Sequence, residues 1–145
     1  MTESKIIDAL PTLAYPPRMT AFTQRFWDAL RAGRFETTVC DSCGRIGFPP
    51  KFVCPACWSR SLSWTVLSGS GTLRSFTEVL VAPTMFLAEA PYNLAVIDLD
   101  EGPRLLSRVV DPYESLTLDA RVRLVIREAW PVPLFEFTLM TGETA

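Results

Sequence analysis

Four cysteines are the side chains in this sequence whose type and spacing most clearly predict chemistry. They form two Cys-x-x-Cys motifs, one at Cys40 and Cys43 and the other at Cys54 and Cys57. A Cys-x-x-Cys turn directs two sulfur atoms to one point, and its backbone N–H groups can donate hydrogen bonds to them. Two such turns therefore make a closed tetrahedral site of four thiolates. The sequence predicts that these four residues bind one structural Zn²⁺ ion.

Iron is the alternative metal. Cys43 is followed by Gly44 and Cys54 is followed by Pro55, and both sequences are also typical of the iron-binding turns of rubredoxin. Spacing alone does not separate the two metals, because both are held by four thiolates in a tetrahedron. A coloured purified protein would indicate iron.

The rest of the sequence offers little for catalysis. The chain has no histidine and no fifth cysteine, so it cannot form a Cys-His pair or a Ser-His-Asp triad. Its candidate carboxylates cluster around predicted turns, where solvated or capping carboxylates are usual. They are Asp98, Asp100, Glu101 and Asp111. Lys51 has no neighbour that would activate it as a nucleophile. We therefore expect no catalytic residues in this chain.

Composition narrows the class of protein. The chain has 145 residues, a formal charge of −2, a pI of about 5.2 and a mean hydropathy of +0.19. No apolar run reaches the roughly 18 residues that a membrane span needs, and the first residues do not form a secretory signal. We expect a cytoplasmic protein, part of whose apolar surface a partner covers. The acidic balance disfavours binding to a polyphosphate backbone.

Residues 1–34 are predicted to form an N-terminal helical segment. A short helix carries Ile6, Ile7 and Leu10, prolines follow, and a second helix spans residues 20–32. The second helix has an apolar stripe and ends at Gly33. Two roles for this stripe stay open, packing on its own domain and docking a partner. Its residues are Phe22, Phe26 and Leu30, with Trp27 beside them.

Two further units are predicted, a zinc ribbon over residues 35–67 and an OB-fold barrel over residues 68–145. Strands at 35–39 and 61–66 flank the cysteine motifs, and a Ser-Gly-Ser-Gly turn at 68–71 separates the units. Five extended runs then predict a small closed barrel. These runs are residues 72–81, 92–99, 104–110, 121–128 and 134–139, with a hairpin turn at 100–103.

Two connections in the barrel are unusually apolar. Residues 82–91 include Met85, Phe86 and Leu87, and residues 129–134 place Trp130 between alanine and proline. Exposed apolar surface costs about 25 cal/mol per Å². Residues 82–91 should therefore fold over the barrel, pair with another chain or line a ligand tunnel. Residues 129–134 form a rigid apolar surface that is either a plug of the barrel or an interface anchor. We interpret Phe86 and Trp130 as candidate contacts to a partner or a substrate channel.

The order of these motifs resembles the "domain of unknown function thirty-five" family, a rubredoxin-like zinc ribbon joined to an OB-fold. The resemblance runs from Phe26 to Phe137 and rests on the cysteine motifs, the Phe-Pro-Pro at 48–50 and the Asp-Glu-Gly at 100–102. It implies that the four cysteines are the metal ligands. One departure is the turn at 118–121, where the family often has a glycine and this chain has Leu-Asp-Ala-Arg.

The resemblance also implies a function. Such proteins are non-catalytic subunits that accompany thiolase-like or ketoacyl-synthase-like enzymes and help to shape an acyl or acyl-CoA channel. More narrowly, the chain is similar to the small subunits of bacterial multicomponent C-acyltransferases that act on acylphloroglucinols. We therefore expect an accessory scaffold subunit of an acyltransferase complex.

Two alternatives stay open. Zinc ribbons and OB-folds also occur in nucleic-acid-binding modules, and several cations would support that role. An electron carrier would require iron at the cysteine site. The cations are Arg45, Lys51 and Arg60 around the ribbon and Arg121 and Arg123 on one strand.

Overall fold

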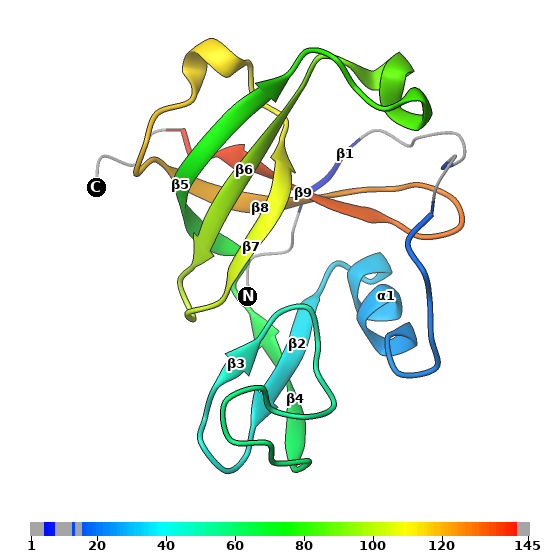
Figure 1. Cartoon of the computed structure of the whole chain (residues 1–145), viewed down its shortest axis with the longest axis vertical. Coiled ribbons are helices and arrows are strands. Elements are labelled where there is room, and N and C mark those ends of the chain that lie inside the picture. Colours follow the sequence, from blue (N-terminus) through cyan, green and yellow to red (C-terminus); the bar gives the residue numbers. More distant parts are fainter. Residues whose placement is uncertain (1–4, 8–12, 14–15, 142–145) are drawn as a thin grey trace.

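The structure is a computed structural model and describes residues 5–7, 13 and 16–141. A barrel forms one end of the molecule and a small three-stranded sheet forms the other, with helix α1 beside the small sheet (Figure 1). This arrangement confirms the mainly β fold, with a cysteine-rich ribbon that precedes a five-stranded OB-type barrel. The division into three units at residues 34 and 67 stays a prediction.

The start of the chain differs from the predicted short helix. Lys5–Ile7 forms strand β1, which pairs in parallel with strand β8 (Arg121–Arg127). The same edge of β8 pairs with strand β5 (Ser70–Val79) only as far as Arg123. Strand β1 takes up the edge from Val125 onward, which would otherwise present unpaired backbone groups. Leu10 lies outside the described residues.

The second predicted helix is present but shorter. Helix α1 spans Gln24–Arg31, because Thr20 and Thr23 form a turn in which each side-chain oxygen accepts a hydrogen bond from the other residue's backbone N–H. At the other end, Gly33 has a φ of 84° and donates to the carbonyl of Leu30. The helix therefore stops at the glycine that the sequence indicates.

The apolar face of α1 packs inside the molecule. We call the group of Phe26, Phe35, Phe48 and Phe135 the aromatic cluster; the contacting rings within it have centroids 5.3–6.2 Å apart. Phe26 comes from α1, Phe35 and Phe48 from the ribbon, and Phe135 from the barrel. The cluster thus joins the three parts of the molecule, and the helix stripe is used for packing within the chain.

The small sheet is built on strand β2 (Phe35–Cys40), which pairs with β3 (Ile46–Gly47) and β4 (Leu62–Leu67). Glu36 on β2 is buried, and its carboxylate accepts hydrogen bonds from Arg25 of α1 and from Arg34, at 3.2 and 3.1 Å. A buried carboxylate that is paired on both oxygens fastens the helix to the ribbon.

The barrel consists of β5, β6 (Tyr92–Leu99), β7 (Arg104–Val109), β8 and β9 (Leu134–Leu139). It closes because β8 pairs with both β5 and β9, and β9 meets β7 at Val109 and Phe137. Residues of β6 alternate between the core and the outer surface. The interior is apolar and includes Leu73, Ile97, Val122, Ile126 and Phe137.

Short 3₁₀ helices lie in two barrel connections, at Thr84–Glu89 (η1) and at Tyr113–Ser115 (η2). The turn at residues 118–121, before β8, has no glycine, and Asp119 takes the left-handed conformation that a glycine could supply there. Asp119 takes a φ of 65°, which Asp tolerates better than most residues, and its carboxylate pairs with Arg74 at 2.6 Å. The aspartate therefore supplies both the left-handed conformation and an ion pair.

Candidate metal centre

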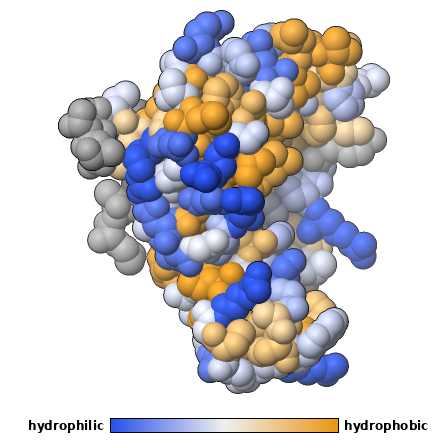
Figure 2. Space-filling model, turned by 60° about the vertical axis from the view of Figure 1, so that its left-hand side comes forward, coloured by the Kyte–Doolittle hydropathy of each residue, from blue (hydrophilic) through white to orange (hydrophobic). Residues whose placement is uncertain are grey.

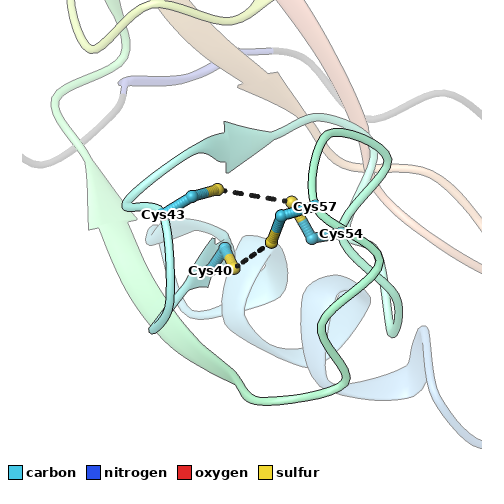
Figure 3. Close-up of side chains that lie close together, drawn as sticks. All are labelled: Cys40, Cys43, Cys54 and Cys57. Carbon is cyan, nitrogen blue, oxygen red and sulfur yellow. Dashed lines mark hydrogen bonds between the residues drawn. The ribbon is translucent and has the colours of Figure 1, made fainter.

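The four cysteine sulfurs converge on one point. All four Sγ atoms lie within 4.8 Å of one another, and the pairs Cys40–Cys57 and Cys43–Cys54 are each 3.6 Å apart (Figure 3). Tetrahedral Zn–S bonds of about 2.3 Å require sulfurs about 3.8 Å apart. The cysteines are therefore positioned to bind one metal ion, and the donor set of four thiolates fits zinc.

Two matching turns hold the sulfurs in place. In the first, Gly44 donates its backbone N–H to the carbonyl of Cys40, and in the second Trp58 donates to the carbonyl of Cys54, both at 2.9 Å. Gly44 and Trp58 occupy equivalent positions and have positive φ values of 76° and 63°. Trp58 was not among the residues predicted from the sequence to belong to the site. Its place directly after Cys57, equivalent to Gly44 after Cys43, is the signal that could have drawn attention to it.

Backbone donors favour the thiolate form at the first cysteine of each turn. The backbone N–H of Cys43, together with that of Ser42, lowers the pKa of Cys40 to about 6 despite burial. The backbone N–H groups of Cys57 and Ala56 lower the pKa of Cys54 in the same way. These hydrogen bonds prepare the buried sulfurs to act as metal ligands.

The fourth thiol behaves differently in the absence of an ion. The backbone N–H of Ser59 acts to lower the pKa of Cys57, but hydrogen bonding to Cys40, burial and the other two thiols raise it to about 12. Four thiolates cannot crowd together without a cation between them. A divalent ion at the centre removes this obstacle, and its binding releases the remaining protons.

A closed site of this type has no open coordination position. Cys40 and Cys54 are buried, whereas Cys43 and Cys57 are exposed at the surface of the ribbon. With four protein ligands, no water is activated by the ion, so its contribution is to the stability of the fold. The geometry supports a structural role for the metal.

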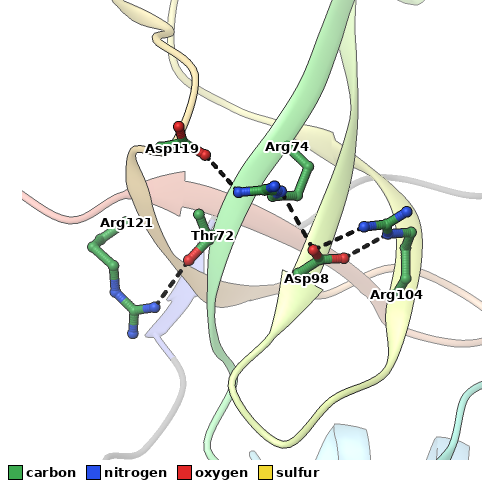
Figure 4. Close-up of polar contacts among 6 residues, drawn as sticks. All are labelled: Thr72, Arg74, Asp98, Arg104, Asp119 and Arg121. Atoms are coloured by element: carbon green, nitrogen blue, oxygen red, sulfur yellow. Dashed lines mark hydrogen bonds and ion pairs between the residues drawn. The ribbon is translucent and has the colours of Figure 1, made fainter.

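The barrel carboxylates form ion pairs instead of a catalytic cluster. Arg104 donates two hydrogen bonds to Asp98, at 2.6 and 3.0 Å, and Arg74 links Asp98 to Asp119 (Figure 4). Arg121 likewise binds Asp100 through two bonds of 2.7 Å. These pairs neutralise much of the positive charge on the outer face of the barrel, which disfavours a polyphosphate ligand there.

The other two candidate carboxylates cap backbone groups. Glu101 accepts hydrogen bonds from the N–H and hydroxyl of Ser68, at 2.9 and 2.6 Å. Asp111 accepts from the N–H of Leu139 at 2.8 Å and from the hydroxyl of Thr138. Each of the four carboxylates thus has a structural partner, although Glu101 Oε2 itself has none among the described residues.

Comparison with known proteins agrees with this geometry. Two family descriptions match consecutive parts of the chain, "ChsH2, rubredoxin-like zinc ribbon domain" over residues 27–63 and "ChsH2, C-terminal OB-fold domain" over residues 64–127. A "DUF35 domain-containing scaffold protein" of Pyrococcus furiosus is 34% identical over 72% of this chain and 77% of its own length. The chain belongs to the DUF35 family. The resemblance inferred from the motifs is therefore confirmed.

Other relatives of this DUF35 protein carry more specific descriptions. A scaffold protein of Methanocaldococcus jannaschii is 36% identical over 61% of this chain, which spans 64% of that relative. The "Benzoylsuccinyl-CoA thiolase subunit BbsA" of Thauera aromatica is 30% identical over 60% of this chain and 59% of its own length. A solved structure, "Ltp2-ChsH2(DUF35) aldolase", superposes with a TM-score of 0.74 at 25% identity, covering 86% of this chain and 98% of that one.

The two apolar connections of this DUF35 barrel are only partly packed. Phe86 is half-buried, with its ring 5.6 Å from the Arg108 guanidinium, whereas its neighbour Leu87 is 59% exposed. Trp130 is 66% exposed. Figure 1 shows η1 and the β8–β9 hairpin on the same side of the barrel. Figure 2 brings the other side of the molecule forward, where hydrophobic surface lies on both sides of a hydrophilic patch. The role of Phe86 and Trp130 in partner contact stays a prediction.

Among the described helices, none combines the length and the apolar character needed to cross a bilayer.

Proposed function

We propose that this protein is a non-catalytic accessory subunit of a thiolase-like acyltransferase complex. In this role it holds catalytic subunits together and helps to shape the acyl-transfer site. The relatives described as scaffold proteins and as a thiolase subunit, and the solved DUF35 chain of an aldolase, support the assignment. Each of these relatives is either called a scaffold or is part of an assembly with other proteins.

The observation that carries the proposal is the use of every thiol in one site. All four sulfurs lie within 4.8 Å of one another, and the sequence contains no histidine. Cys40, Cys43, Cys54 and Cys57 are proposed to ligate one Zn²⁺ ion, which leaves no cysteine nucleophile and no imidazole base for acyl transfer. The reacting cysteine and its base must then belong to the partner.

The finer assignment concerns substrate and partners. The motifs resemble the small subunits of C-acyltransferases for acylphloroglucinols, so we propose C-acylation of a phenolic or acyl-CoA-type substrate in secondary metabolism. The proposed catalytic partners are thiolase-like and ketoacyl-synthase-like subunits in the cytoplasm. An acyl or acyl-CoA ligand would lie at their interface.

The proposed docking face contains the β8–β9 hairpin and the connection that holds η1. Trp130, Leu87 and Met85 are exposed large apolar side chains in these two segments. Aromatic side chains that a partner buries commonly dominate the binding free energy of an interface. The apolar stripe of α1 is not part of this face, because Phe26, Trp27 and Leu30 are buried in the core of the molecule.

Co-purification from cells that contain the partner subunits tests the proposal. The isolated chain should have no acyltransferase activity, and the assembled complex should be active. Trp130→Ala should weaken association about thirtyfold, which corresponds to a hot-spot loss of about 2 kcal/mol. Leu118→Ala is the matched control, since Leu118 is about equally exposed. It lies in the connection between η2 and β8, which Figure 1 shows on the opposite side of the barrel from the β8–β9 hairpin. Acyl transfer by the chain alone would contradict the proposal.

A further inference from the structure

An open groove lies between the ribbon and the β6–β7 hairpin, which points toward the small sheet in Figure 1. We call it the ribbon–barrel groove. Its volume is about 910 Å³, and it is lined by residues 44–48, 51 and 55 of the ribbon and by residues 98–99 and 101–104 of the barrel. A ligand in this groove would therefore contact both parts of the chain.

The charges without a partner in this groove are positive. Arg104 donates to both oxygens of Asp98, and Glu101 accepts the two hydrogen bonds from Ser68 described above. The side chains of Arg45 and Lys51 form no hydrogen bond or ion pair with any described residue. Two like charges in one groove favour the binding of an anion. The charged residues of the lining are Arg45, Lys51, Asp98, Glu101 and Arg104.

Lys51 is held in place more firmly than an ordinary surface lysine. Its backbone N–H donates to the Thr38 hydroxyl at 2.7 Å, and its carbonyl accepts from the same hydroxyl at 2.9 Å. Thr38 is only 2% exposed. A Cβ added to Gly47 would lie 3.1 Å from Lys51 Cγ, so the lysine stem lies against β3.

The ammonium group of Lys51 remains accessible. Lys51 is half-buried, but its Nζ is not among the buried side-chain atoms that lack a partner in the described chain. Arg45 is exposed, and its carbonyl accepts the backbone N–H of Cys40 at 2.9 Å, which fixes its backbone to the first cysteine turn. The half-buried Ile46 and the exposed Pro55 add apolar surface to the same groove.

Carboxylates suit this groove better than phosphate. Phosphate sites commonly use several free backbone N–H groups of a turn in addition to cationic side chains. The N–H groups of the two turn glycines that line the groove are already used, because Gly44 donates to Cys40 and Gly102 donates to Leu99 at 2.9 Å. What remains is two separate cations beside apolar surface, and these match two acidic side chains with an apolar one between them.

We propose that the ribbon–barrel groove binds an acidic segment of the catalytic partner, whose carboxylates pair with Arg45 and Lys51. The inference rests on the proposed accessory function, since it needs a partner. The groove shares no residue with the docking face around Trp130, and its binding chemistry can be measured on the free chain. Failure of the measurement below therefore leaves the co-purification test of the accessory function intact.

Two peptides that differ only in charge test the groove. One is acetyl-Glu-Leu-Glu-amide and the other is acetyl-Gln-Leu-Gln-amide. Each is titrated into the full 145-residue chain loaded with zinc, while the NMR signals of the backbone amides of Arg45, Gly47, Lys51 and Gly102 are followed. The acidic peptide should bind about fivefold more tightly, as expected for two solvent-accessible ion pairs. The preference should vanish at about 0.5 M salt, where such pairs are screened.

Lys51→Met keeps the apolar stem but removes the charge, so the preference should fall to about twofold. Arg60→Gln is the matched control, because Arg60 is an exposed cation of the ribbon that does not line the groove. That variant should keep the fivefold preference.

Three results would overturn the proposal. The wild-type chain could bind both peptides equally, which is readable even if the methionine variant does not fold. Pyrophosphate could bind more tightly than the acidic peptide at the same signals, which would assign the groove to phosphate. The preference could also survive in Lys51→Met while that variant loses zinc during dialysis against a chelator. The lysine would then serve to balance the negative charge of the four thiolates.

Discussion

At the scale of single residues, the buried polar side chains of the ribbon have partners that stabilise them. The four cysteines share one point, and the buried Glu36 has two arginines. Trp58 is the exception, because it is 78% exposed and has a left-handed backbone at a position where the equivalent turn uses glycine. Nothing within the described chain explains why tryptophan stands there.

Replacing one buried cysteine tests whether it binds the metal, provided that a nearby substitution of a residue that is no ligand has no such effect. Cys54→Ser removes a thiolate that backbone N–H groups stabilise, so zinc affinity should fall by at least about a hundredfold. The measurement is zinc content per chain after dialysis against a competing chelator. Ser42→Ala is the control, because it removes an exposed hydroxyl that donates to Ser59 but keeps the backbone N–H that bonds Cys40. Equal retention of zinc by both variants would exclude Cys54 as a ligand.

At the scale of elements, ion pairs link neighbouring strands of the barrel. Asp98 on β6 binds Arg104 on β7, and its pKa is lowered first by the hydrogen bond from Arg104 and then by the charges of Arg104 and Arg74, against the effect of burial. Asp100 and Arg121 connect the β6–β7 hairpin to β8, and the pKa of Asp100 is also lowered by the hydrogen bond from Arg121. Both carboxylates therefore stabilise the fold most when they are ionised.

The dependence of stability on pH should show this effect. Because the pKa of Asp98 is lower in the folded state than its unfolded value of about 3.9, the pair stabilises the fold fully above that value. The stabilisation is lost as the pH falls through the folded pKa. Wild-type protein should exceed Asp98→Asn in free energy of unfolding at pH 7, and the gap should narrow below about pH 4. Urea unfolding at several pH values measures it, and a gap that widens with acid would contradict the assignment.

At the scale of the whole molecule, the aromatic cluster joins the ribbon, α1 and the barrel. Phe135 contributes the barrel side of this contact, with its ring 5.6–5.9 Å from those of Phe26, Phe35 and Phe48. Packing of this kind lets the ribbon and the barrel unfold together, so loss of the metal should weaken both. Metal binding in the ribbon then also raises the free energy of unfolding of the barrel, through the aromatic cluster.

Phe135→Ala tests this coupling. The change should cost about 2–4 kcal/mol of stability and split the thermal unfolding of the zinc-loaded chain into two transitions, of which only the ribbon transition responds to chelator. Phe76→Ala is the matched control, since Phe76 packs on Tyr113 within the barrel, with ring centroids 5.6 Å apart. That variant should lose stability but keep one transition. A single, chelator-sensitive transition in Phe135→Ala would show that the cluster does not couple the two parts.

Much of this architecture was predictable because it depends on local patterns. The strands at Tyr92–Leu99 and Leu134–Leu139 agree with prediction to the residue. Tyr92–Leu99 alternates between buried and half-buried residues, and residues typical of turns flank both strands. The prediction of a short helix at the start of the chain was wrong, because Lys5–Ile7 forms a strand. Three residues carry too little periodicity to reveal their structure, and they become a strand only because β8 offers an open edge.

The sequence by itself determined the cysteine site, the order of ribbon and barrel, and the absence of a histidine-dependent centre, because these follow from residue type and spacing. Only the tertiary structure decided that the stripe of α1 packs inward and that the arginines of the barrel pair with its carboxylates. Each of these depends on residues far apart in the chain meeting in space, and no local pattern encodes such a meeting.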